Sequence, residues 1–193
     1  DALDKQTYEK KAIEAIVVWD EIIKENDTVV PNLKVENISL RITATNKDGY
    51  NLAMARNIGV IESSGEYIMF CDSRLEPETN SISIFYHAMD ALEEGKIWFF
   101  GDKGAHKNAF VENFSFIKRF DFIKFGMMNE RLDRYGGMSQ ELRTRWIKQG
   151  GELKYLADAR AKELLSSKLT TEKRKDIIES KFKLLKMYRG ESY

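Results

Sequence analysis

Short apolar runs alternate with helix-like segments along most of this chain. Residues 14–20 (EAIVVWD), 40–46 (LRITATN) and 66–72 (EYIMFCD) are continuously apolar or β-branched, which predicts strands buried on both faces. Between the last two, residues 51–65 space their apolar positions for a helix that ends at Gly65. A strand–helix–strand order usually builds a parallel sheet with right-handed crossovers. We therefore expect an α/β fold.

The second half of the chain continues with the same two kinds of segment. Further strands are expected at 96–102, 113–119 and 152–157, and helices at 81–92 and 140–151. From residue 160 onward the chain looks helical and basic. We expect a main unit over residues 1–159 and a basic helical extension over residues 160–193 that packs on it.

The start of the chain departs from the usual order of elements. A doubly wound nucleotide-binding sheet opens with a strand, whereas the first residues here are polar and helix-like. Two explanations stay open: the first strand is missing from this chain, or the fold does without it.

Composition narrows the class of protein. The 193 residues include 31 Lys or Arg and 31 Asp or Glu, so the net charge is zero and no general attraction to nucleic acid is expected. The one cysteine excludes a disulfide framework and a cysteine-rich zinc site. No apolar run approaches the ~20 residues that span a bilayer. We expect a cytoplasmic protein, either free or in peripheral contact with the inner face of a membrane.

Three of the predicted strands end in an acidic residue. These residues are Asp20, Asp72 and Asp102. Because ligands of open α/β sheets gather at the carboxyl ends of the strands, such acids can bind a metal or accept a hydrogen bond from a ribose or a base. The alternative is that Asp simply favours strand ends and turns.

The block from Gly49 to Ser73, GYNLAMARNIGVIESSGEYIMFCDS, resembles the central part of family-2 glycosyltransferases of the GT-A fold. The ARN triplet, the G-V step and the GEYI-x-F-x-D strand end follow one another in the order of that family. Upstream, QTYEK and EAIVVWD are similar to its preceding block, and downstream IKRFDFIKFGMMNERLDRYGG is similar to its acceptor-side block. The resemblance covers about Gln6 to Ala157.

The resemblance implies a mostly parallel GT-A sheet flanked by helices, with hexosyltransferase activity of the kind used in polysaccharide biosynthesis. The donor would be a nucleotide-sugar, typically of UDP type, and the acceptor a hydroxyl of a glycan or another molecule, with inversion at the sugar. The resemblance implies that Asp20 binds the nucleobase of the donor and that Arg56 lies near the nucleotide. It places Asp72 in the metal-binding motif D-x-D. It implies no partnership with nucleic acid.

Two motifs of that family are altered in this chain. The second acid of D-x-D is Arg74, which removes one hard oxygen ligand and adds a repelling cation. Three alternatives follow: a Mn²⁺ or Mg²⁺ ion still binds at Asp72, the Arg74 guanidinium contacts the diphosphate in its place, or Arg74 is only a surface residue. His106 could supply a further metal ligand or be an ordinary loop histidine.

The second altered motif is the one that carries the general base. The family's Y-G-G-E-D falls on residues 135–139, where Met138 and Ser139 replace the two acids. Glu141, Asp102 and Asp133 are the substitutes to consider for a general base. Two functions from different classes therefore stand: an active glycosyltransferase with an altered donor site, and a degenerate, non-catalytic domain that binds a nucleotide, a glycan or a partner protein.

The C-terminal stretch KRKDIIESKFKLLKMYR has apolar positions among lysines at helical spacing. Such a helix can rest on an anionic membrane surface, or it can pack its apolar stripe on the domain and leave its lysines in water. Packing is the favoured alternative because the helix also contains acids.

Overall fold

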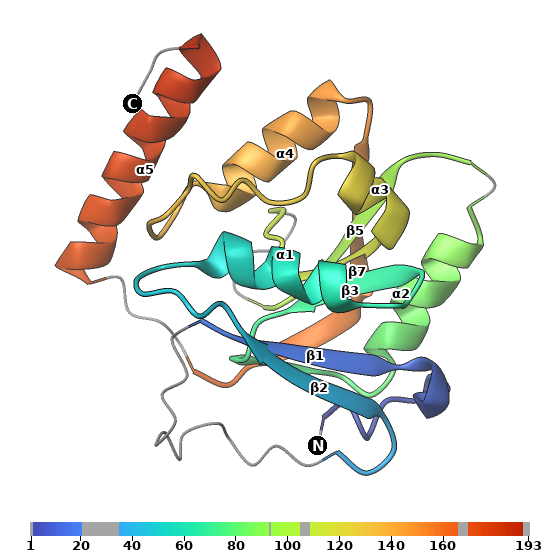
Figure 1. Cartoon of the computed structure of the whole chain (residues 1–193). Coiled ribbons are helices and arrows are strands. Elements are labelled where there is room, and N and C mark those ends of the chain that lie inside the picture. The colour runs from blue at the N-terminus through green and yellow to red at the C-terminus, as the bar shows by residue number, and fades with distance from the viewer. Residues whose placement is uncertain (1, 21–34, 93, 105–108, 166–169, 191–193) are drawn as a thin grey trace, which may run out of the picture.

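The computed structural model describes residues 2–20, 35–92, 94–104, 109–165 and 170–190, and its α/β class agrees with the sequence (Figure 1). The elements in chain order are a short 3₁₀ helix (Lys10–Ala12), β1 (Glu14–Trp19), β2 (Ser39–Ala44), α1 (Leu52–Glu62), β3 (Tyr67–Cys71), β4 (Leu75–Pro77), α2 (Ser81–Asp90), β5 (Ile97–Asp102), β6 (Phe114–Lys118), α3 (Arg119–Lys124), α4 (Met138–Lys148), β7 (Glu152–Glu163) and α5 (Thr171–Arg189).

The strands form two sheets, and their pairing corrects the expectation of a mostly parallel sheet. The larger sheet has the order β3-β6-β5-β7-β4, in which only β5 and β7 are parallel. The smaller sheet pairs β1 with β2 in parallel. The physical reason lies in the connections: the residues that the structure describes between β5 and β6 form no helix, and antiparallel neighbours need no crossover helix.

The smaller sheet is joined to the rest of the fold through α1 and the turn that follows it. The Glu14 carboxylate at the start of β1 accepts hydrogen bonds from the backbone N–H groups of Ser64 (2.6 Å) and Gly65 (2.8 Å), just before β3. In the part of the chain that the structure describes, β1 pairs with β2 alone, so its other edge carries no strand. This arrangement is compatible with both explanations offered for the first strand.

The core lies on both faces of the larger sheet, and β5 shows how one strand serves both. Trp98 and Phe100 belong to the apolar cluster under α1, α3 and α4, whereas Ile97 and Phe99 belong to the cluster under α2. Successive side chains of a strand point to opposite faces, so a continuous apolar run is what a strand covered on both sides requires.

The C-terminal part begins later than the sequence suggests. Residues 160–163 belong to β7, where Ala161 is buried and pairs with Pro77 of β4, and the helix α5 starts at Thr171. The good helix formers after residue 159 are overridden here by pairing with a neighbouring strand.

Helix α5 packs against the loop that precedes α4. Gly136 and Gly137 of that loop both have positive φ, 99° and 80°. A Cβ at Gly136 would lie 2.9 Å from Cγ1 of Ile177, and one at Gly137 would lie 3.0 Å from Cδ1 of Leu184. The two glycines therefore meet both a conformational and a steric requirement. Among the described residues, no helix is both long and apolar enough to cross a bilayer.

Candidate functional site

Three strand ends meet at one edge of the larger sheet. β3 ends just before Asp72, β5 ends just before Lys103, and β6 begins just after Glu112 and Asn113. The backbone N–H of Asp72 donates to the carbonyl of Asn113 (3.0 Å), which fixes the first and third of these segments side by side. Because β3 and β6 are antiparallel, the end of one strand lies beside the start of the other.

Arg56, on α1, reaches into this edge and is the centre of a polar cluster. Its guanidinium pairs with Asp72 at 2.9 Å and with Glu112, and the three side chains are 10%, 22% and 5% exposed. Burial alone would lower the pKa of Arg56, but the two carboxylates outweigh it and raise that pKa. The guanidinium is therefore held charged between two acids, and these ion pairs tie α1 to the edge of the larger sheet.

Both oxygens of Asp72 are already engaged. One pairs with Arg56, and the other accepts from the Asn113 side chain at 3.1 Å and lies 3.4 Å from Arg74. Among the described residues there is no group of three His, Cys, Asp or Glu that could hold a metal ion. A single carboxylate between two guanidinium groups does not fit a divalent cation that needs several oxygen ligands. His106 lies outside the described residues.

Lys103 adds a further cation to the same edge. Its ammonium group donates to the Asn113 side chain, which in turn donates to Asp72. Burial lowers the pKa of Lys103, against the opposing effect of the nearby Glu112, Asp72 and Glu163 carboxylates. Lys103 is thus a half-buried amine that contacts Asp72 through the side chain of Asn113.

The start of α4 closes the cluster on another side. Ser139 donates to the second oxygen of Glu112, and the Met138 sulfur lies 3.8 Å from a terminal nitrogen of Arg56. These are the two positions at which the resemblance expects acids. Here Ser139 contacts an acid from another segment, and Met138 contacts Arg56.

We call this cluster the Arg56 network. Its members are Arg56, Asp72, Arg74, Lys103, Glu112, Asn113 and Ser139. Within it three cations face two carboxylates. Such a set can neutralise the charge of an anionic ligand with guanidinium and ammonium donors.

The other residues predicted from the sequence lie around the network or apart from it. Asp20 accepts a hydrogen bond from the backbone N–H of Asn51 at 3.1 Å, directly before α1, and so holds the start of the helix that carries Arg56. Asp102 accepts from the backbone N–H of Gly104 at 2.8 Å and directly precedes Lys103. The structure thus brings Arg56, Asp72 and Arg74 together, while Asp20 contacts the start of the helix that carries Arg56.

Glu141 has a separate partner. Its carboxylate pairs with Arg145 one turn later on α4 (2.6 Å), and the same guanidinium donates to the carbonyls of Phe125 (2.9 Å) and Met127 (2.6 Å). These contacts tie α4 to the end of α3. They commit Glu141 to a structural ion pair.

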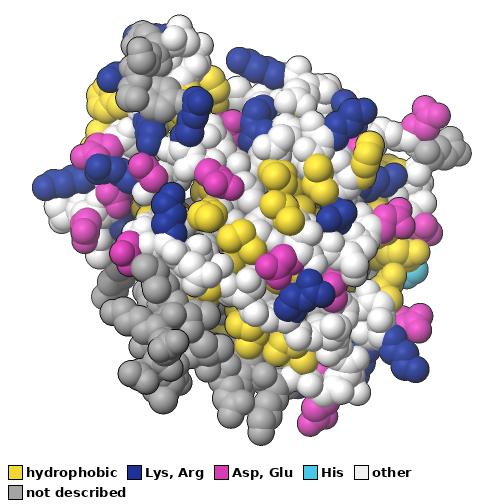
Figure 2. All heavy atoms as spheres, in the orientation of Figure 1, with side chains coloured by type: hydrophobic (Ala, Val, Ile, Leu, Met, Phe, Trp, Pro, Cys, Tyr) yellow, Lys and Arg dark blue, Asp and Glu magenta, His cyan; other side chains and the backbone are white. Residues whose placement is uncertain are grey.

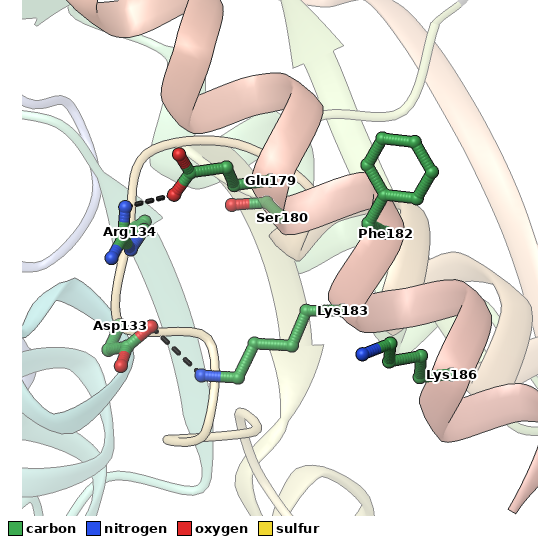
Figure 3. A pocket seen from close by; sticks show the side chains of 7 residues that line it. All are labelled: Asp133, Arg134, Glu179, Ser180, Phe182, Lys183 and Lys186. Atoms are coloured by element: carbon green, nitrogen blue, oxygen red, sulfur yellow. Dashed lines mark hydrogen bonds and ion pairs between the residues drawn. The ribbon is translucent and has the colours of Figure 1, made fainter. Parts of the chain in front are cut away.

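A cavity of about 370 Å³ lies elsewhere, between α5 and the loop before α4 (Figure 3). It is lined by Asp133, Arg134, Glu179, Ser180, Phe182, Lys183 and Lys186. Of the candidate residues named from the sequence, Asp133 lines it, and there it pairs with Lys183.

Comparison with known proteins identifies the fold. No family model and no curated protein matches this chain. Solved structures do match: GalNAc-T7 with UDP, GalNAc and Mn²⁺ (16% identity, TM-score 0.69, 93% of this chain and 44% of that one) and Staphylococcus aureus TarS in complex with UDP (14% identity, TM-score 0.64, 93% and 57%). A mutant of Drosophila β1,4-galactosyltransferase 7 with manganese, UDP-Gal and xylobiose also matches (13% identity, TM-score 0.51, 83% and 79%).

These neighbours are GT-A glycosyltransferases, and the GT-A class expected from the sequence is thereby confirmed. At such low identity the likeness concerns the fold. This chain spans 44% of the GalNAc-T7 chain and 34% of a longer TarS chain that also matches, at TM-score 0.67 and 13% identity.

Proposed function

We propose that this chain is a glycosyltransferase-like domain that binds the diphosphate of a nucleotide-sugar at the Arg56 network. The observation that carries the proposal is that two cations lie beside Asp72 where β3 and β5 end. Arg74 pairs with Asp72, and Lys103 is linked to Asp72 through Asn113. The carboxyl ends of strands are where open α/β sheets bind nucleotides. The likeness to GT-A glycosyltransferases crystallised with UDP supports the same place for the donor.

In this proposal cations of the chain replace a divalent metal. Arg74 is 36% exposed, so its guanidinium can turn from Asp72 toward a ligand, and a planar guanidinium can bind two phosphate oxygens at once. Lys103 would add a second cation beside it. The competing arrangement, a Mn²⁺ or Mg²⁺ ion on Asp72, would first have to displace the contacts that now occupy both oxygens of that carboxylate.

The transfer itself would be an inverting displacement. The acceptor hydroxyl would attack the anomeric carbon as the bond to the nucleoside diphosphate breaks, and the leaving diphosphate would be stabilised by Arg74 and Lys103. A carboxylate must take the hydroxyl proton. Asp102 is better placed for this than Glu141, because it directly precedes Lys103 while Glu141 pairs with Arg145.

A non-catalytic binding domain is the second candidate function. It is favoured by Met138 and Ser139 standing where the resemblance expects acids, and by the engagement of Glu112 with both Arg56 and Ser139. The two functions separate in a turnover assay. Release of UDP from UDP-sugars that is lost in Asp102→Asn supports the transferase, whereas UDP binding without turnover supports the binding domain.

Isothermal titration calorimetry with UDP tests the donor site directly. We expect UDP to bind equally well in EDTA and in Mn²⁺, and Arg74→Ala to weaken the affinity by about 10- to 100-fold, since a hydrogen bond to a charged group contributes about 1.5–3 kcal/mol. Arg134→Ala, which removes a 54% exposed guanidinium that pairs with Glu179 of α5, should leave the affinity unchanged. Binding in Mn²⁺ alone would establish the metal arrangement instead, and no binding of UDP or any other nucleoside diphosphate would end the proposal.

A further inference from the structure

Helix α5 is held on the domain by one face. Leu184 is buried there, and the Ser180 hydroxyl donates to the carbonyl of Tyr135 at 3.3 Å. Two ion pairs beside this face, Lys183 with Asp133 (2.9 Å) and Glu179 with Arg134, join the helix to the loop before α4 (Figure 3). These contacts fix which side of the helix turns away from the domain.

The side that turns away is apolar along its middle. Ile178, Phe182 and Leu185 are 55%, 63% and 50% exposed. They are spaced by four and three residues, so at about 100° per residue they form one stripe, opposite the buried Ser180 and Leu184. Figure 1 shows α5 at the outer edge of the molecule.

Cations flank this stripe on both sides. Arg174 and Lys181 lie along one side, Lys175 and Lys186 along the other, and all four are exposed. The three acids of α5, Glu172, Asp176 and Glu179, lie together on the flank between the stripe and the domain. Figure 2 shows Lys and Arg side chains beside hydrophobic ones over the region of α5.

We propose that this outer face of α5, defined by Ile178, Phe182 and Leu185 with Arg174, Lys175, Lys181 and Lys186, docks on an anionic lipid membrane. An apolar stripe bordered by cations matches the interface of such a membrane, where acyl chains meet negative headgroups. A purely apolar partner would leave the four cations without a complement. This inference does not depend on the proposed donor site.

The charge pattern sets the expected size of the effect. A Lys or Arg close to an anionic leaflet strengthens binding by about fivefold. Reversal of one such charge therefore weakens binding by about fivefold or more, and loss of the Phe182 ring weakens it further by removing apolar area from the interface.

Co-sedimentation of the 193-residue chain with vesicles tests the proposal. The vesicles are phosphatidylcholine alone, or phosphatidylcholine with phosphatidylglycerol. The test variant is Phe182→Ser with Lys181→Glu. The matched control is Phe120→Ser with Lys124→Glu, which also removes one exposed phenylalanine, here 70% exposed, and reverses one exposed lysine. Sedimentation velocity without lipid reports whether either variant changes self-association.

We expect the parent chain and the control to bind the anionic vesicles, to bind neutral vesicles at least tenfold more weakly, and to lose anionic binding when salt is raised. The test variant should lose most of that binding while its circular dichroism spectrum stays that of the parent chain. Equal losses in the two variants, equal binding to both kinds of vesicle, or no binding at all would overturn the proposal. A dimer that dissociates on Phe182→Ser would show that a second copy covers the face, which would also overturn it.

Discussion

Arg56→Met gives the most informative stability measurement on this protein. The substitution keeps much of the side-chain volume and removes the charge that separates Asp72 from Glu112. Loss of one partner from a buried ion pair costs about 3–5 kcal/mol. For a protein of this size that corresponds to a fall of about 6–20 °C in Tm.

Urea unfolding followed by circular dichroism measures this loss. The control is Arg134→Met, which breaks a pair whose side chains are 54% and 53% exposed and should cost less than about 1 kcal/mol. In Arg56→Met the buried Glu112 loses its guanidinium partner while Asp72 still pairs with Arg74, so the folded state takes up a proton at Glu112 that the unfolded state does not. Its stability should therefore rise as pH falls from about 7 to about 5. A loss no larger than that of Arg134→Met, or a loss of the same size at both pH values, would refute the reasoning.

Three further outcomes are expected. Lys103→Met should weaken UDP binding at neutral pH. Because burial lowers the pKa of Lys103, the affinity of the parent chain measured by calorimetry should fall as pH rises through alkaline values below the ordinary lysine pKa, and more steeply than that of the variant. Glu141→Gln should lower the free energy of unfolding by about 1–3 kcal/mol and leave UDP affinity unchanged, because its partner is Arg145; a variant of normal stability would contradict this. Gly101→Ala should lower the free energy of unfolding in urea by about 1–3 kcal/mol, because its Cβ would lie 2.4 Å from the Phe114 ring and 2.5 Å from the carbonyl oxygen of Ala159. The control is Gly59→Ala in α1, which should be neutral or stabilising.

Several strands and helices of this fold can be predicted from the sequence because each depends on a pattern within a short stretch of the chain. The apolar runs of β1 and β3 and the helical spacing of α1 are each complete within a dozen residues. Arg56 and Asp72 could be placed together because both lie within one strand–helix–strand unit. The pairing of β5 with β6 is different, since a continuously apolar run suits a parallel and an antiparallel central strand equally well.

The residues missed by sequence reasoning lie on segments that only the tertiary fold brings to the site. Glu112 reads as the end of a polar loop and Asn113 as the start of the next strand, and nothing in their neighbours indicates that Glu112 pairs with Arg56, 56 residues earlier. Lys103 follows a predicted strand but carries no motif. One signal was available. Burial of an acid and an amide next to a buried strand is unfavourable unless both side chains have hydrogen-bond or ion-pair partners. The course of β7 past residue 160 was missed for the same reason, because its partner β4 is distant in sequence.

The central claim is that the diphosphate of a nucleotide-sugar binds at the Arg56 network. A crystal structure of this chain with UDP bound tests it most directly. The account predicts diphosphate oxygens within about 3 Å of the Arg74 guanidinium and the Lys103 ammonium, with Asp72 still paired to Arg56. UDP bound at another edge of the sheet, with Arg74 and Lys103 making no contact to it, would contradict the account.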